Sequence, residues 1–428
     1  MGSGKSPNLL LEGDCLSLLR GFTDSHFSSI VTDPPYEISM MSKGWDSSGI
    51  AFNVELWQQC LRVLKPGGHL LAFGAPRTWH RLTVAIEDAG FEIRDSIAWL
   101  QAQGMPHGLD VGKAVDKKLG GVSKVIGVAA DFSSDGARRK TDGSHTLPKN
   151  GVGDHGYKDR WSAPVAVPET VDAQRFEGWN TALKPGFEPI VVARKPLVGT
   201  VAENALQHGT GAYNINACRV GDDEVQINHL QSWSGFGQEK RPDYTPRKSK
   251  GRWPANVALT HDVECGDAAC APGCPVAVLD EQAGIRRSGA NPTRRRASKF
   301  QGTYGKFLGD SAPFPVRGAE AGVASRFYPV FRFESKAPKS ERPVVDGRSF
   351  PTVKPLALMS YLVRLVTPPG GLVLDIFAGS GTTLQAASDE GFAWVGIEKE
   401  SAHIEFIEAR LNDAGIHFEF KEERDLAA

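Results

Sequence analysis

Segments with the apolar pattern of a buried strand alternate along this chain with segments that have the apolar spacing of a helix. Short apolar runs typical of buried strands occupy residues 30–32 and 69–73. Apolar residues recur at helical spacing over 54–64 and 78–89, and a Lys-Pro-Gly-Gly turn is expected at 65–68. The alternation resumes over 349–420, with a helix expected at 356–366. Alternating elements of this kind predict an α/β fold with a mainly parallel sheet covered on both faces.

The middle of the chain interrupts this pattern, because residues 101–335 are rich in glycine, proline and polar residues. One segment, 183–198, contains a strand that we expect to return beside the strand at 91–100. We therefore predict five parts: a first half of the core at 8–100, an excursion at 101–182, a core strand at 183–198, a larger inserted region at 199–335 and a second half of the core at 336–420.

Composition adds limits to this picture. The 428 residues favour more than one structural unit. No run of about 18 apolar residues occurs, and the first residues are polar, so we expect neither a membrane span nor a signal peptide. Cytoplasmic localisation is the corresponding expectation.

A chemically unusual corner follows the first buried strand. Asp33, Pro34, Pro35 and Tyr36 stand directly after residues 30–32. Two prolines fix the backbone and remove two N–H donors, which leaves carbonyl oxygens available to a ligand. A carboxylate, free carbonyls and an aromatic ring suit the binding of a planar amino group. The alternative is an ordinary turn, since Asp-Pro pairs commonly begin turns.

A second motif lies far downstream. The apolar run 372–374 leads into Asp375 and the glycine-rich turn around Gly379 and Gly381, and a helix is expected to follow. Glu398 closes another apolar run roughly 20 residues later, the separation at which an α/β unit delivers a carboxylate to ribose hydroxyls. A nucleoside-containing cofactor is therefore expected. A dinucleotide is disfavoured because Leu384 occupies the place of the third glycine that a pyrophosphate loop needs.

Together these motifs resemble the amino-group DNA methyltransferases that use S-adenosylmethionine, in the motif order of the beta class, with the catalytic motif first. Gly13-Asp14 resembles the family's acidic adenine motif, and the segment from Pro351 to Pro355 resembles the one near the methionine end of the cofactor. The resemblance implies a Rossmann-like sheet, circularly permuted, with a large inserted target-recognition region at 199–335. It also makes 8–100 the catalytic half and 336–420 the cofactor-binding half.

The resemblance implies roles for individual residues. The catalytic corner would be Asp33, Pro34, Pro35 and Tyr36, with Asp33 and the Pro34 carbonyl accepting the amino hydrogens and Tyr36 stacking on the base. The cofactor would be held by Asp14, Thr352, Lys354, Asp375, Phe377, Gly379, Ser380, Gly381, Thr382 and Glu398. Simpler structural roles stay open: Asp14 as a helix N-cap, Thr352 and Lys354 as a surface cap, and the two glycines as a helix-entry turn.

The chemistry implied is transfer of a methyl group to an exocyclic nitrogen by in-line displacement, on a base flipped out of the duplex. Methylation at carbon 5 of cytosine is not expected, because it needs a cysteine nucleophile, usually after proline, and no Pro-Cys pair occurs. Family members with aspartate at the first catalytic position mostly modify adenine, so adenine N6 is expected and cytosine N4 is the alternative.

Double-stranded DNA is the expected partner, although the net charge is only −1 and local clusters must supply the contacts. Cations in two runs of the inserted region are candidate phosphate contacts, namely Arg247, Lys248, Lys250, Arg286, Arg287, Arg294, Arg295 and Arg296. The alternative is a solvated loop. A homodimer and a cognate restriction endonuclease are candidate further partners.

Three of the six cysteines cluster with a histidine, at His261, Cys265, Cys270 and Cys274. Cysteine and histidine close together in a cytosolic protein suggest a structural zinc ion rather than disulfides. Ordinary reduced thiols are the alternative, because the spacing lacks C-x-x-C pairs. Cys15, Cys60 and Cys218 are expected to be small buried residues.

Two other functions stay open. The first is methylation of RNA or of a glutamine side chain, although such enzymes usually carry the cofactor motif first. The second is a catalytically silent DNA-binding protein that retains the fold, although intact Asp33, Tyr36 and Gly379 count against it.

Overall fold

The computed structural model describes residues 8–38, 46, 48–101, 108–121, 124–128, 164–227, 247–262, 265–266, 269–271, 274–287, 321–331, 342–350 and 352–426. The chain forms two compact units. The first comprises Met1–Ala102 together with Phe187–Ala428, and the second comprises Gln103–Gly186. The predicted excursion at 101–182 covers much of the same chain as the second unit.

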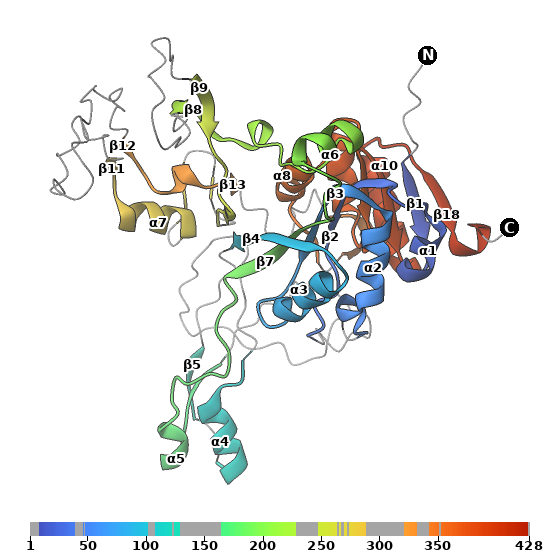
Figure 1. The fold of residues 1–428 in the computed structure, drawn as a ribbon. Coiled ribbons are helices and arrows are strands. Elements are labelled where there is room, and N and C mark those ends of the chain that lie inside the picture. Colours follow the sequence, from blue (N-terminus) through green and yellow to red (C-terminus); the bar gives the residue numbers. More distant parts are fainter. Residues whose placement is uncertain are drawn as a thin grey trace, which may run out of the picture. The chain divides into compact units, whose positions relative to one another are not determined.

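A large mixed sheet forms the centre of the first unit (Figure 1). Ten strands belong to it among the described residues, in the order β13-β10-β4-β7-β3-β2-β16-β17-β1-β18. Their bounds are β1 (Leu9–Glu12), β2 (Phe27–Thr32), β3 (Leu64–Phe73), β4 (Glu92–Leu100), β7 (Phe187–Arg194), β10 (Val257–Thr260), β13 (Val330–Phe331), β16 (Leu372–Asp375), β17 (Ala393–Glu398) and β18 (Glu419–Glu422).

Strand directions agree with the sequence prediction. Every pair in this sheet is parallel except those of β7, which runs antiparallel to both of its neighbours, β3 and β4. The expected strand near residues 183–198 therefore does lie beside the strand at 91–100. A mixed α/β fold with a mainly parallel sheet is confirmed.

Successive side chains of the central strands point to opposite faces of the sheet, as the two-residue period of a strand requires, and pack into two different hydrophobic clusters. Leu10, Val31 and Leu71 belong to one buried cluster, whereas their chain neighbours belong to a second. Helices α8 (Leu356–Val366), α9 (Thr382–Asp389) and α10 (Ser401–Asp413) complete the first cluster. Helices α1 (Cys15–Gly21), α2 (Val54–Val63) and α3 (Trp79–Asp88) complete the second. Both faces of the sheet are therefore covered.

Helix α8 shows how the sequence sets an element next to the site. Pro355 caps its start, and Leu358, Leu362 and Leu365 recur at helical spacing and are buried against the sheet. Burial of each such side chain contributes on the order of 1.5–3 kcal/mol. Because α8 is fixed in this way, the preceding Lys354 is held at the carboxyl edge of the strands.

One local expectation needs correction. The predicted turn at 65–68 falls within β3 rather than between elements. Pairing with β2 jumps from Phe27–Leu64 to Ser29–His69, and Gly67 has a positive φ of 73°. The glycines therefore form a bulge inside a strand, because the neighbouring strand continues to pair on both sides of them.

The inserted region of the first unit contributes smaller elements. They are α6 (Val201–His208), β8 (Val220–Ile227), β9 (Arg247–Arg252), α7 (Pro275–Ala283), β11 (Arg286–Arg287) and β12 (Ala321–Gly322). Strands β14 (Val344–Val345) and β15 (Arg348–Ser349) follow this region, within residues 336–420. Strands β8 and β9 pair in one antiparallel ladder, and β11 pairs with β12 in another. The role of this region in target recognition and the permuted motif order remain predictions.

The second unit contains α4 (Val111–Leu119), α5 (Val171–Gln174), β5 (Lys124–Val128) and β6 (Pro164–Val167). Buried Asp116 organises it by accepting hydrogen bonds from the backbone N–H groups of Glu169 and Thr170 and from the Thr170 hydroxyl, at 2.7–3.0 Å. No helix among the described residues is long and apolar enough to cross a membrane.

Candidate active site

A cavity of about 530 Å³ opens at the carboxyl ends of β2, β16 and β17. Adjacent parallel strands bring their carboxyl ends to one edge of a sheet, which is where α/β folds bind ligands. Residues from both halves of the core line this cavity, namely Asp14, Asp33, Pro34, Pro35, Tyr36, Phe350, Thr352, Lys354, Asp375, Phe377, Gly379, Ser380, Thr382 and Glu398. Of the residues expected at the catalytic corner and the cofactor, all but Gly381 line it.

The corner after β2 is held by an ion pair. Lys354 Nζ lies 2.7 Å from Asp33 Oδ2 and 2.9 Å from the Tyr36 hydroxyl oxygen. The Tyr36 hydroxyl donates to Glu188 Oε2 at 2.6 Å, and Thr78 Oγ1 donates to the Tyr36 carbonyl at 2.8 Å. Asp33 and Tyr36 are therefore fixed by side chains from three distant segments.

Asp33 keeps one acceptor free. Its Oδ1 is buried and has no hydrogen-bond partner among the described residues. A buried acceptor without a partner is costly, so its presence at a cavity indicates a ligand donor. Burial raises the pKa of Asp33 above its usual range, while the positive charge of Lys354 acts in the opposite direction.

Burial also opposes the charge on Lys354, yet Asp33 and Glu188 together raise its pKa above the ordinary value. The pKa of Tyr36 is raised well above its usual range by burial and by the two neighbouring carboxylates. Lys354 is therefore charged and the Tyr36 hydroxyl is protonated near neutral pH.

Glu188 and Gln101 also belong to this corner, although no sequence motif had indicated them. Glu188 Oε2 lies 3.4 Å from Lys354 Nζ, and Gln101 Nε2 donates to Glu188 Oε1 at 2.7 Å. The direction of strand β7 could have indicated that Glu188 lies at this corner. Because β7 is antiparallel, its first residues lie at the same edge as the carboxyl ends of the parallel strands.

The turn after β16 forms the other end of the cavity. Gly379 adopts a positive φ of 54°, and its N–H donates to Glu398 Oε2 at 2.8 Å. The other carboxylate oxygen, Oε1, accepts the N–H groups of Lys399 and Glu400 at 3.1 and 2.9 Å. Glu398 is therefore rigidly placed at the cavity wall, with a side chain that is only 9% exposed.

Asp375 lies between the two ends of the cavity. Its Oδ1 accepts the Thr32 hydroxyl at 2.7 Å and the Phe377 N–H at 3.1 Å. Burial raises the pKa of Asp375 to about 6, although these hydrogen bonds favour the ionised form. A cationic ligand would favour the ionised carboxylate further.

Asp14 combines two roles that the sequence left open. Its Oδ1 accepts the N–H groups of Leu16 and Ser17 at 3.1 and 3.2 Å, which makes it the N-cap of α1. It also lines the cavity. Burial acts to raise the pKa of Asp14, but the capping N–H groups and Lys399 lower it overall.

Three other residues that were predicted to hold the cofactor, Ser380, Gly381 and Thr382, lie at the start of α9. The Ser380 and Thr382 hydroxyls lie 3.0 Å apart, and the Ser380 carbonyl accepts from Arg410 Nε at 2.6 Å. Gly381 lies outside the lining and caps α9 with a positive φ of 76°. Its expected role as a helix-entry turn fits this position, while direct cofactor contact stays a prediction.

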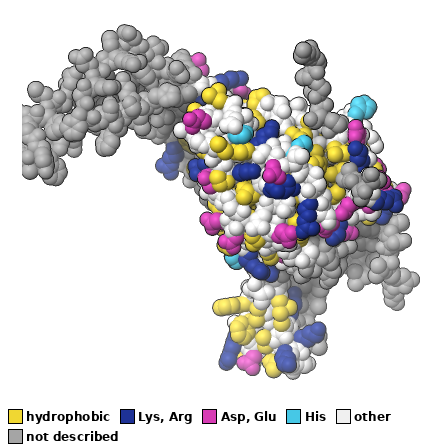
Figure 2. Space-filling view, turned by 45° about the vertical axis from the view of Figure 1, so that its right-hand side comes forward, with side chains coloured by type: hydrophobic (Ala, Val, Ile, Leu, Met, Phe, Trp, Pro, Cys, Tyr) yellow, Lys and Arg dark blue, Asp and Glu magenta, His cyan; other side chains and the backbone are white. Residues whose placement is uncertain are grey.

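The candidate DNA-binding cations are dispersed. Arg286 is exposed on β11, which also contains Arg287, and exposed Lys250 pairs with Asp222 at 2.8 Å. Arg247 and Lys248 belong to β9, and Arg294, Arg295 and Arg296 lie outside the described residues. On the face drawn in Figure 2, Lys and Arg side chains are interspersed with Asp and Glu. No single basic face is visible there.

His261, Cys265, Cys270 and Cys274 do come together. Their ligand atoms all lie within 4.8 Å of one another. The cluster is built by the segment between β10 and α7, on the first unit. The other three cysteines are buried single thiols, as expected.

Fold and cavity define the class first: an α/β protein with a carboxylate-lined cavity at the carboxyl ends of its central parallel strands. Comparison with known proteins then gives the family. The model of the DNA methylase family, N6/N4 type, matches residues 27–128 and 160–409. The chain belongs to this DNA methylase family, which confirms the resemblance found in its sequence.

Individual relatives match over shorter segments. The type II methyltransferase M.HindIII of Haemophilus influenzae is 24% identical over 168 residues, which is 38% of this chain and 38% of that protein. The type II methyltransferase M.BglI of Bacillus subtilis is 49% identical over 51 residues, 12% of this chain and 15% of that protein. The chain therefore aligns with well under half of either relative.

Two solved structures also align with most of this chain. The cytosine-N4-specific PvuII DNA methyltransferase has a TM-score of 0.42 at 13% identity, with 99% of this chain and 93% of that chain covered. The M1.HpyAVI–SAM complex has a TM-score of 0.37 at 13% identity, with 94% and 99% covered.

Proposed function

We propose that this protein transfers a methyl group from S-adenosylmethionine to the exocyclic amino group of a base in DNA. The observation that carries the proposal is the shared cavity. The Asp33 corner, the Gly379 turn and Glu398 come from distant parts of the chain and line one space. Such a space brings an acceptor for an amino group next to a nucleoside site.

At the catalytic corner, Asp33 Oδ1 would accept a hydrogen of the target amino group, since it has no partner among the described residues. The Pro34 carbonyl would accept the second hydrogen. Two acceptors localise the nitrogen lone pair, which makes the amino group a better nucleophile. Lys354 keeps Asp33 anionic through its 2.7 Å ion pair, and the Tyr36 ring would stack on the flipped base.

The cavity residues fit the cofactor. Glu398 would bind the ribose hydroxyls and Asp14 the adenine amino group, and Asp375 would face the positively charged methionine portion. A β carbon at Gly379 would project to within 3.9 Å of Phe350, another lining residue, so glycine keeps this space open. When bound, S-adenosylmethionine supplies an electrophilic methyl group on its sulfonium.

Lys354 and Thr352 were expected near the amino-acid tail of the cofactor. Thr352 lines the cavity, but Lys354 already pairs with Asp33 and Glu188. We therefore propose that Lys354 serves the catalytic corner, and that its contact with a cofactor carboxylate is secondary.

Adenine N6 is our proposed target, because an aspartate opens the catalytic corner. Cytosine N4 is the second candidate, since it presents the same amino-group chemistry. Duplex DNA would be bound by cations of the inserted region, among them exposed Arg286 and its neighbour Arg287. A homodimer and a partner endonuclease would be compatible with this activity.

The test is incubation of the purified protein with unmethylated plasmid DNA and methyl-labelled S-adenosylmethionine, followed by nucleoside mass spectrometry. Labelled N6-methyladenine is expected, and labelled N4-methylcytosine would identify the other base. Label in RNA or protein but not in DNA would contradict the proposed acceptor. Cofactor binding without any transfer would identify a silent protein.

A further inference from the structure

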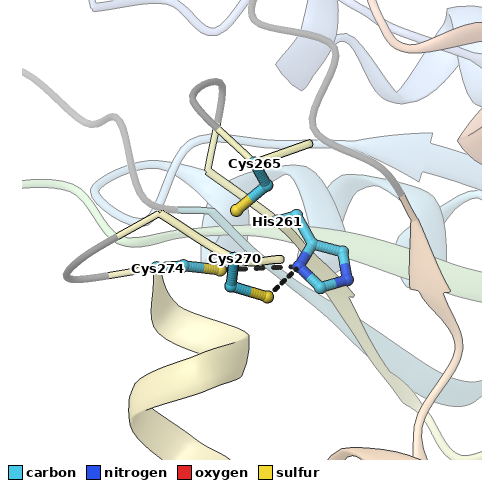
Figure 3. Close-up of side chains that lie close together, drawn as sticks. All are labelled: His261, Cys265, Cys270 and Cys274. Atoms are coloured by element: carbon cyan, nitrogen blue, oxygen red, sulfur yellow. Dashed lines mark hydrogen bonds between the residues drawn. The ribbon is translucent and has the colours of Figure 1, made fainter. Parts of the chain in front are cut away.

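A compact set of metal-binding side chains lies away from the cavity (Figure 3). His261 follows β10 directly, and Cys274 immediately precedes α7. Cys265 and Cys270 come from the segment between them. All four side chains converge on one point, and their ligand atoms lie within 4.8 Å of one another.

The separations match those around a tetrahedral ion. Zn–S and Zn–N bonds of about 2.3 and 2.0–2.1 Å place neighbouring sulfur and nitrogen ligands about 3.5 Å apart. Here His261 Nδ1 lies 3.4 Å from Cys270 Sγ and 3.5 Å from Cys274 Sγ. The histidine therefore points the same ring nitrogen at two thiols, as a shared ion requires.

The surroundings of the sulfur atoms favour thiolates. The Ala271 N–H donates to Cys265 Sγ at 3.2 Å, and the Asp262 N–H donates to Cys274 Sγ at 3.5 Å. Backbone donors to ligating sulfur stabilise its negative charge. Cys270 is exposed, so packing gives no reason for a cysteine there, and none of the six cysteines forms a disulfide.

We propose that His261, Cys265, Cys270 and Cys274 bind one structural Zn²⁺ ion. Four protein ligands complete a tetrahedron and leave no open position for a substrate, which distinguishes a structural site from a catalytic one. Three thiolates and an imidazole are the donors that zinc prefers over magnesium or calcium.

The local core explains why an ion is useful here. Among the described residues, Leu259, Cys274 and Val276 are the fully buried members of the cluster that joins β10 to α7, and partly buried apolar residues pack around them. So small a core supplies little stability, and small substructures of this kind often depend on a metal. The ion would fix α7 to the edge of the central sheet, and α7 leads directly to Arg286 and Arg287. It would thereby position two candidate phosphate contacts.

The test is elemental analysis of the full-length protein, purified without added chelator and then dialysed. We expect about one zinc per chain in the wild type and in Cys60→Ala, which removes a buried thiol outside the cluster. Cys270→Ser and Cys274→Ser should hold much less zinc. Cobalt-substituted wild-type protein should show the visible absorption of tetrahedral thiolate coordination.

Wild-type protein without zinc, even after incubation with Zn²⁺, would overturn the proposal, as would unchanged zinc in both serine variants. Cys270 is exposed, so its substitution should leave the central sheet folded, which S-adenosylmethionine binding and thermal unfolding can verify. Metal content is measured without DNA, so this result is independent of the proposed methylation.

Discussion

Lys354 Nζ and Asp33 Oδ2 form an ion pair at 2.7 Å, although the two residues are 321 positions apart in the chain. One residue follows the buried strand β2, and the other precedes α8. Their contact joins the first half of the core, residues 8–100, to the second half, residues 336–420. It also occupies one oxygen of Asp33 and leaves the other, Oδ1, without a hydrogen-bond partner among the described residues.

Replacing Lys354 with methionine should therefore impair Asp33 specifically. Without the ammonium group, burial raises the pKa of Asp33 further, and the acidic limb of the pH–rate profile should move to higher pH. Because Lys354 pairs with two carboxylates, its loss should also lower the free energy of unfolding, on the order of 1–3 kcal/mol. Steady-state kinetics across pH and denaturant titration measure both effects.

Lys421→Met is the matched control, because Lys421 pairs with Glu419 at 3.5 Å on an exposed strand. It should leave the pH profile and stability unchanged. An unaltered profile in Lys354→Met would show that the ion pair does not govern the ionisation of Asp33.

Cofactor affinity should depend on the ionisation of Asp375. Its pKa is raised to about 6 by burial, so ionisation costs free energy in the free protein and is complete only above that pH. A cationic ligand prefers the ionised form, so affinity should fall as pH drops through 6. The dissociation constant should be about ten-fold higher at pH 5 than at pH 8.

Calorimetric titration of S-adenosylmethionine across this range measures the effect. Asp375→Asn keeps the shape and a Thr32 acceptor but loses the titration, so its affinity should be weak and independent of pH in this range. A wild-type affinity that is flat from pH 5 to pH 8 would contradict the assigned role.

Alanine at Gly379 should reduce cofactor affinity more than stability. The position has φ of +54°, and among the described residues a β carbon would contact Phe377 O at 3.8 Å and Phe350 at 3.9 Å. Strain in the left-handed region costs about 1–2 kcal/mol, and the added methyl group would enter the cavity. Binding titrations and thermal unfolding separate the two effects.

Gly381→Ala and Gly21→Ala are the comparison variants for Gly379→Ala. A β carbon at Gly381 would lie 3.1 Å from Ile407 at φ of +76°, so that variant should lose stability foremost. Gly21 ends α1, and no atom of the described residues lies within 4 Å of a β carbon added there, so alanine should be neutral or slightly stabilising. Equal affinity in Gly379→Ala and Gly21→Ala would contradict a close approach of the cofactor.

Alanine at both Arg286 and Arg287 should weaken DNA binding without changing cofactor affinity. Each phosphate contact contributes a slope of about −0.9 to the dependence of log affinity on log salt. Loss of two contacts should reduce that slope by about 2 in fluorescence titrations with duplex DNA. Lys421→Ala is the control for loss of a surface cation, and a slope shared by all three proteins would remove these arginines from the interface.

Much of the core could be predicted from the sequence, because local patterns determine it. Residues 356–366 carry apolar positions at helical spacing, and that helix forms at those bounds. The glycine-rich turn and the Asp-Pro-Pro-Tyr segment each follow a buried strand. Because these two strands pair in parallel, both segments lie at the same edge of the sheet.

Contacts between distant segments could not be predicted in the same way. The pairing of Lys354 with Asp33, and the place of Glu188 behind Tyr36, depend on the order of strands in the sheet. The bulge at 65–68 depends on the pairing of β3 with β2, which continues on both sides of it. Local turn propensity at Gly67 and Gly68 carries no information about that partner.

The central claim is that Asp33 acts on the amino group and not on the cofactor. The most direct measurement compares wild-type protein with Asp33→Ala, following both methyl transfer to unmethylated DNA and calorimetric binding of S-adenosylmethionine. We predict that transfer falls by roughly 100-fold or more while cofactor affinity is largely unchanged. Lost cofactor binding, or undiminished transfer, would contradict the assignment of this corner.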